Sequence, residues 1–145
     1  MSNLYAVEAE LIQRITDTVT GFESVLDEST FAEATEVTRL LDAAIVQADG
    51  AELLDQGEDE IGLLIERQQW TLIVAVPNLP AAAMGGETTA THAGALLYEV
   101  MRNIIGWSPE GAYRPFRYVD RPPPDIRLGH SLFPVTLEVV MGIGL

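Results

Sequence analysis

The chain has 145 residues, 48% of them hydrophobic, so it is long enough for one domain with a substantial core and too short to favour two. It contains no cysteine and no lysine, which excludes disulfides, cysteine-ligated zinc, a thiol nucleophile, a lysine Schiff base and a Walker A phosphate loop. All eight basic residues are arginine and the net charge is -14, which argues against tight binding to duplex DNA through phosphate contacts.

The acidic charge is concentrated in the first part of the chain. Residues 1–60 contain 15 acids and two arginines, whereas residues 61–145 contain seven acids and six arginines. The two parts therefore present surfaces of different charge. Such acidity suits a surface past which DNA slides without binding, and it equally suits solubility or adaptation to high salt.

No targeting or membrane-spanning pattern is recognisable in the sequence. The first residues lack a basic segment followed by a short apolar run, and no apolar run approaches the roughly 18 to 20 residues that span a bilayer. We therefore expect a soluble protein with no membrane partner and no classical export signal.

The N-terminal third is predicted to be mainly helical. Ser2 to about Val19 forms a helix, because apolar residues recur there every three to four positions. Asp27 to Thr30 is a turn, and Thr30 with Glu33 makes a capping-box pattern for a short helix that continues to Leu41.

Two apolar runs in the middle of the chain predict an antiparallel hairpin. Ala43 to Val46 is a short strand before them, and Asp55 to Glu60 is an acidic loop. Glu60 to Glu66 and Trp70 to Val76 form the hairpin, separated by three polar residues. Both alternating sets of the second run are apolar, which predicts a strand that is central or covered on both faces.

The following segment contains the clearest helix of the chain. Pro77 to Glu87 is predicted to be a flexible loop that exposes Leu79 and Met84. Ala95 to Pro109 is predicted to hold an amphipathic helix that Gly106 ends, with Trp107 folding back on its apolar end.

The C-terminal third predicts two strands joined by a rigid connection. Phe116 to Val119 is a short strand, Arg121 to Asp125 is an elbow stiffened by three prolines, and Leu132 to Met141 is the last strand. The predicted fold class is α/β of the α+β type, in which two long helices pack against a mainly antiparallel sheet.

Patterns that would carry catalysis are missing. His130 and Ser131 are adjacent in sequence, an arrangement that rarely makes a catalytic pair, and no GxSxG elbow is present. His92 lacks the HExxH context, and the acids from Asp55 to Glu60 lack the spacing of an EF-hand. We expect a protein that is not an enzyme, with no catalytic residue, no cofactor and no metal site.

The order of the predicted elements, together with the motif formed by Gly106, Trp107 and Pro109, resembles the tail-terminator proteins of tailed bacteriophages, in particular the Mu-like tail-terminator family. The resemblance covers nearly the whole chain. It implies a single domain over residues 1–145 with helices packed on a mainly antiparallel sheet, and it offers no catalytic residues to transfer.

The same resemblance implies a structural role in the virion, at the tail and neck, with assembly in the host cytoplasm. Family members form hexameric rings at the head-proximal end of the tail tube, stop its elongation and provide a docking surface for neck and head-completion proteins. The implied partners are further copies of the chain, the tail tube protein and neck proteins, with the sheath protein as a further candidate. Genomic DNA would pass through the ring without sequence-specific binding.

Exposed loops and arginines are the candidate protein–protein interface. Leu79 and Met84 on the loop would be unfavourable in water, and proline fixes a loop's shape before binding. The arginines of the C-terminal part can meet an acidic neighbour. The candidate residues are Leu79, Met84, Arg114, Arg117, Arg121, Pro123 and Arg127. Two alternatives remain open: another neck or tail subunit of a phage, and an acidic protein-binding or DNA-mimic module.

Overall fold

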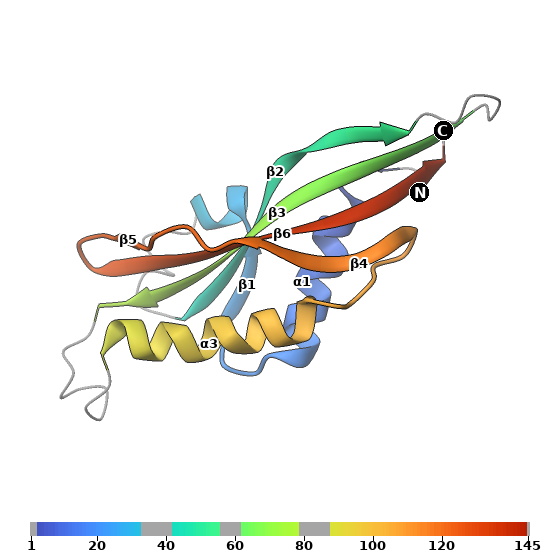
Figure 1. Ribbon diagram of the computed structural model, residues 1–145. Helices are drawn as coiled ribbons and strands as arrows, with labels where there is room; N and C mark the ends of the chain where they lie inside the picture. The colour runs from blue at the N-terminus through green and yellow to red at the C-terminus, as the bar shows by residue number, and fades with distance from the viewer. Residues whose placement is uncertain (1–2, 33–41, 56–61, 79–87, 145) are drawn as a thin grey trace.

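The fold is a twisted six-stranded sheet with two long helices on one face (Figure 1). The computed structural model describes residues 3–32, 42–55, 62–78 and 88–144. The strand order is β1-β2-β3-β6-β4, and the short β5 also pairs with β6. All described strand pairs are antiparallel except β1 with β2. The predicted α+β class with a mainly antiparallel sheet is confirmed.

Both long helices follow the predicted apolar spacing. Helix α1 (Ala6–Thr18) begins four residues later than expected and buries Val7, Leu11 and Ile15. Helix α3 (Thr89–Ile104) begins with a cap in which the Thr88 hydroxyl accepts a hydrogen bond from the Thr91 N–H at 3.1 Å. It ends as predicted, because Gly106 adopts a φ of 89°, a conformation that favours glycine.

The predicted hairpin of residues 60–76 is wrong. Residues 63–77 form one continuous strand, β3 (Leu63–Pro77). Arg67, Gln68 and Gln69 include neither glycine nor proline, so they can extend the strand. Gln68 is buried, and its side chain is hydrogen bonded to the Trp70 indole and to Glu66. The prediction that this run forms a central strand is confirmed, since β3 lies between β2 and β6.

The hairpin partner of β3 is β2 (Ala43–Asp55), which is much longer than the predicted strand at Ala43 to Val46. Its far half is exposed and polar, so the hydrophobic pattern gave no signal for it. Two register irregularities, between Ala48 and Gly50 and between Leu53 and Asp55, further obscure the alternation. Most of the predicted acidic loop lies outside the described residues.

Strand β1 (Ser24–Asp27) was not predicted, because it has only four residues, the last of which is the first residue of the expected turn. Asp27 ends it and caps the helical residues 28–32: its carboxylate accepts a hydrogen bond from the Thr30 N–H at 2.7 Å. The predicted cap at Thr30 is therefore wrong by three positions. The rest of the predicted short helix lies outside the described residues.

The last strands match their predicted places but are longer. Strand β4 (Ala112–Asp120) contains the predicted strand, β5 (Asp125–Ile126) follows the proline elbow, and β6 (His130–Gly144) contains the predicted last strand. The inward-facing set of β6 is buried under the helices: Val135, Leu137, Val139, Met141 and Ile143.

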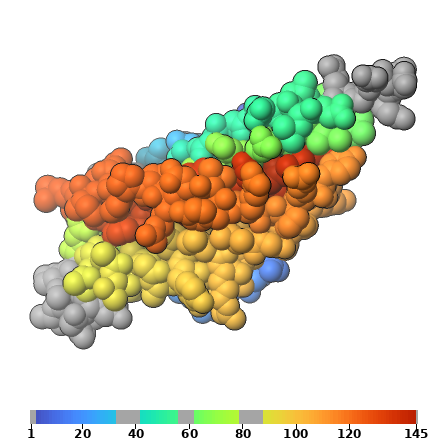
Figure 2. Space-filling view, in the orientation of Figure 1, coloured from blue at the N-terminus to red at the C-terminus, as the bar shows by residue number. Residues whose placement is uncertain are grey.

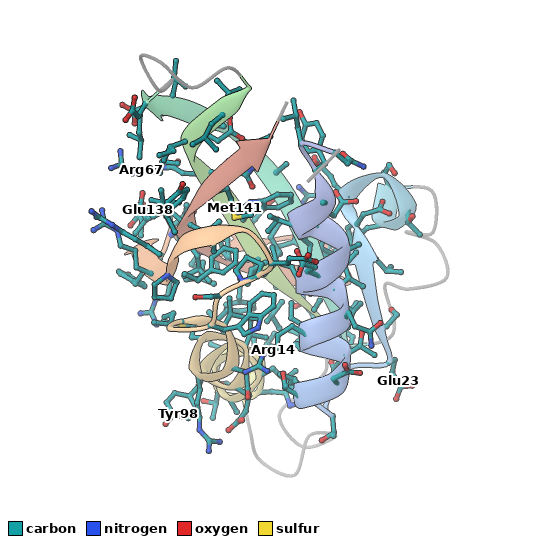
Figure 3. The ribbon with its side chains drawn as sticks, turned by 90° about the vertical axis from the view of Figure 1, so that its right-hand side faces the viewer. Arg14, Glu23, Arg67, Tyr98, Glu138 and Met141 are labelled. Carbon is teal, nitrogen blue, oxygen red and sulfur yellow. The ribbon has the colours of Figure 1, made fainter. Side chains whose placement is uncertain are left out.

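The two faces of the sheet differ in chemistry. The helix-covered face holds the main core, which includes Trp70 and Phe116. The opposite face has a small apolar cluster of Ala43, Ile45 and Ala75, against which Phe31 packs, and a charged region on β2, β3, β6 and β4. Figure 3 shows Met141 on the side of α1 and the side chains of Arg67 and Glu138 on the other side.

Candidate assembly surfaces

The end of α3 is fixed to β4 by a stack of aromatic and cationic groups. Trp107 stacks on Phe116, with ring centroids 5.9 Å apart, and the Arg14 guanidinium lies 5.5 Å from the Trp107 ring centroid. The Phe116 N–H donates to the Trp107 carbonyl, and the Gly106 N–H donates to the Phe116 carbonyl. The motif from Ile104 to Pro109 thus sets the position of β4 and occupies part of its outer edge.

A charge network crosses the polar face of the sheet from β2 to β4. Arg67 lies 3.0 Å from a Glu52 oxygen and 3.6 Å from a Glu138 oxygen, and Glu138 also pairs with Arg117. Glu138 is only 5% exposed, whereas Glu52 and Arg117 are exposed. Beside this network, Thr71 donates to Asp49 and its hydroxyl lies 3.1 Å from that of Thr136. These alternating charges hold four strands in register on a face without an apolar cover.

The structure places the five described candidate residues along one margin of the molecule. They lie on β4, on the elbow and beside β5, and Figure 2 shows this orange segment as a band across one face. Arg117 forms an ion pair with Glu138, and the Arg127 guanidinium lies 2.8 Å from the Asp125 carboxylate. Arg114, Arg121 and Pro123 are exposed, and these two arginines form no ion pair with any residue that the structure describes. Leu79 and Met84 lie outside the described residues.

Sequence reasoning missed a second surface at the far half of β2. Strand β1 pairs with β2 only as far as Val46, and no strand that the structure describes pairs with the outer edge of β2 from Gln47 to Leu54. A pocket of about 110 Å³ lies beside this edge; it is mainly apolar and is lined by residues of the N-terminal segment, β2 and β3. The only sequence signal was the pair of apolar residues Leu53 and Leu54 in an acidic context.

A second, acidic pocket adjoins the first and shares Tyr5 and Ala48 with it. Burial, and after it the charge of Asp27, raises the pKa of Glu8 in its lining. Hydrogen bonds, first from the Thr30 N–H and then from the Ser29 hydroxyl, lower the pKa of Asp27. Among the residues that the structure describes, no basic residue lines this pocket.

Of the residues considered for catalysis, Ser131 and His92 have side-chain partners, whereas neither ring nitrogen of His130 has a hydrogen-bond partner among the described residues. The Ser131 hydroxyl donates to the Asn78 side chain at 2.6 Å, and His130 is buried with its ring edge-on to Phe31. His92 Nε2 lies 2.7 Å from a carboxylate oxygen of Asp42, which ties the start of α3 to the start of β2. Within the described ranges, no three histidine, aspartate or glutamate side chains are grouped to hold a metal ion. No helix in those ranges is long and apolar enough to cross a membrane.

Open strand margins, exposed apolar tips and a charged sheet face are typical of a subunit that works through protein contacts. The model of the phage tail terminator protein family matches residues 1–144, and the chain belongs to this family. It is thus a structural protein of the bacteriophage tail, located in the virion and interacting with other tail components. A comparison with curated proteins gave no match. The narrower Mu-like assignment stays a prediction.

Proposed function

We propose that the protein forms a six-membered ring at the head-proximal end of the tail tube, where it stops elongation and presents a docking surface to neck and head-completion proteins. The family match over residues 1–144 carries the proposal. The whole chain acts as one ring-forming domain, assembled in the host cytoplasm. It works stoichiometrically, without catalysis or a cofactor, because occupying a tube end needs only contacts.

Contacts around the ring are heterologous, so each subunit uses two different surfaces. The margin that carries Arg114 and Arg121 supplies one of them, since its charge suits the acidic N-terminal part of a neighbour. Leu79 and Met84 contact a neighbour, the tail tube protein or the sheath protein. The chain's net charge of -14 keeps the ring from binding DNA that passes through its opening.

Electron microscopy of purified protein mixed with tail tubes tests this function. We expect a six-fold ring at one end of each tube, and no further growth of tubes capped in this way when tube protein is added. Bare tube ends, a ring of another order, or continued growth from capped ends would each count against the proposal. Binding to a DNA-binding partner in place of tubes would instead favour the DNA-mimic alternative.

A further inference from the structure

The two side margins of the sheet carry opposite charge. Strand β1 lies at one margin and β4 at the other, on opposite sides of α1 in Figure 3. The β1 margin, residues 23–32, has three acids and no basic residue in its sequence, whereas the β4 margin, residues 112–127, has four arginines and two acids. Two β1 margins would repel each other, but a β1 margin and a β4 margin attract.

Both margins also carry apolar surface. Beside the β1 margin, the apolar pocket, whose lining includes Tyr5 and Trp70, adjoins the acidic pocket. On the β4 margin, Tyr118 is 49% exposed and Val119 is 38% exposed. Aromatic side chains and arginine are enriched where proteins bind each other. An apolar pocket with an acidic pocket beside it suits an aromatic side chain with an arginine nearby, and β4 offers both.

The register of the sheet places the apolar features at the same level along the strands. Ala48 lines both pockets and pairs with Trp70. Trp70 pairs with Leu137, which in turn pairs with Tyr118. Directly paired residues point to the same face of a sheet, so Tyr118 and Ala48 both lie on the side that the helices cover.

The charged features are level with each other in the same way. Asp27 lies in a row of paired residues that reaches Val135 on β6. On the other side of β6, Asp120 pairs with Thr136, so the next residue, Arg121, is level with Val135. A rotation about an axis parallel to the strands preserves this level. It therefore brings Arg121 of one subunit opposite Asp27 of the next.

We propose that the β4 margin of one subunit packs against the β1 margin of the next, with Tyr118 at the apolar pocket and Arg121 at the acidic pocket beside Glu8 and Asp27. The strands then run along the ring axis. Arginine suits the acidic pocket because Val46 also lines it, so the apolar stem of the arginine has a surface to pack on. The contact joins two different surfaces, as closure of a ring requires. The inference rests on the proposed ring and identifies one of its subunit contacts.

Chemical crosslinking tests the contact, because the chain has no cysteine of its own. The variant carries Ser29→Cys and Val119→Cys, at exposed positions whose side chains bear no charge. It is treated with a short bis-maleimide after binding to tail tubes, and we expect a ladder of covalent oligomers that ends at a closed hexamer. The matched control carries Ser29→Cys and Leu53→Cys, with Leu53 54% exposed on β2. Both its cysteines lie on the β1 side of the sheet, so it should form no ladder.

The outcomes separate this contact from the ring itself. Rings seen by microscopy without crosslinking between positions 29 and 119 would overturn the contact and leave the ring proposal standing. A ladder of equal strength in the control would also overturn the contact. Tubes without rings, for the unmodified protein as well, would overturn both proposals.

A charge exchange provides a second measurement. Arg121→Glu should weaken ring formation about 10-fold with an unchanged thermal melt, because the side chain is exposed and forms no ion pair with a described residue. Adding Glu28→Arg, at an exposed position in the lining of the acidic pocket, should restore ring formation. Unaltered ring formation by Arg121→Glu, or no restoration by the second change, would contradict the contact.

Discussion

Glu138 illustrates how one residue holds the uncovered face of the sheet together. Its carboxylate is almost fully buried between Arg67 and Arg117, which come from the two strands beside β6. Neither partner could be inferred from sequence, since the pairing depends on the register of β3, β6 and β4. The side of the sheet on which Glu138 lies does follow from the sequence, because Glu138 alternates with the apolar residues Leu137 and Val139 along the strand.

The variant Glu138→Ala should lower the free energy of unfolding by about 1–3 kcal/mol, because it leaves two arginines facing each other without their shared acceptor. Urea unfolding measures this loss. Glu52→Ala is the matched control: Glu52 contacts the same Arg67 but its side chain is 69% exposed, so the change should be within about 0.5 kcal/mol. Equal losses in the two variants would show that the network does not depend on Glu138.

The raised pKa of Glu8 predicts a pH-dependent effect on stability. Above its folded pKa the ionised Glu8 opposes folding, because burial and Asp27 disfavour its charge. This cost disappears as pH falls through the folded pKa towards the ordinary value of 4.5. Glu8→Gln should therefore stabilise the isolated chain at pH 7 and have little effect at pH 4. A gain of the same size at both values, measured by thermal melts, would contradict the assignment.

The exposed arginines Arg114 and Arg121, on the margin formed by β4 and the elbow, lead to a separate prediction about assembly. Arg114→Glu and Arg121→Glu together should weaken tube capping with an unchanged melt, because both side chains are exposed and unpaired among the described residues. Reversing Arg117 would not separate the two effects, since it would also break the pair with Glu138. Arg102→Glu, at an exposed position on α3, controls for net charge. If Arg102→Glu weakened tube capping as much per reversed charge as the double variant does, the loss would come from net charge. That result would contradict a contact at Arg114 and Arg121.

At the scale of elements, hydrophobic periodicity predicted the helices and strands that are buried and missed the strand segments that are exposed. Helix α3 and the central strand β3 were recognisable because most of their inward-facing residues are apolar. The far half of β2 is exposed, and its pairing with β3 arises only in three dimensions. The hairpin predicted at residues 60–76 was wrong for the same reason. The polar residues 67–69 are typical of a turn in sequence, and their pairing with β2 and β6 arises only in the folded chain.

Helix α3 provides the test of core packing. Ile104 is fully buried at its last turn, so Ile104→Asp should cost several kcal/mol by placing an unpaired carboxylate in the core, and the subunit should unfold and lose tube capping. Its neighbour Ile105 is 37% exposed, so Ile105→Asp should cost clearly less. Circular dichroism melts compare the two. Similar losses at both positions would mean that the helix is not anchored through Ile104.

At the scale of the whole molecule, the candidate site follows from the shape of the sheet. The far end of β2 and the turn between β5 and β6 lie at opposite ends of the elongated sheet (Figure 1), and each carries an exposed leucine, Leu53 on β2 and Leu128 in the turn. The sequence could indicate the margin that carries Arg114 and Arg121, because residue type alone identifies it. It could not indicate the β2 edge or the pocket, because both depend on how far each strand continues past its neighbour.

The length of tails made without this protein tests the central claim most directly. If the protein terminates the tube, removing its gene should give tails of uncontrolled length that fail to join heads. Supplying the intact chain should restore uniform tails, and Ile104→Asp should not. Electron microscopy of the particles gives the length distribution. Tails of normal, uniform length in the absence of the protein would contradict the terminator function.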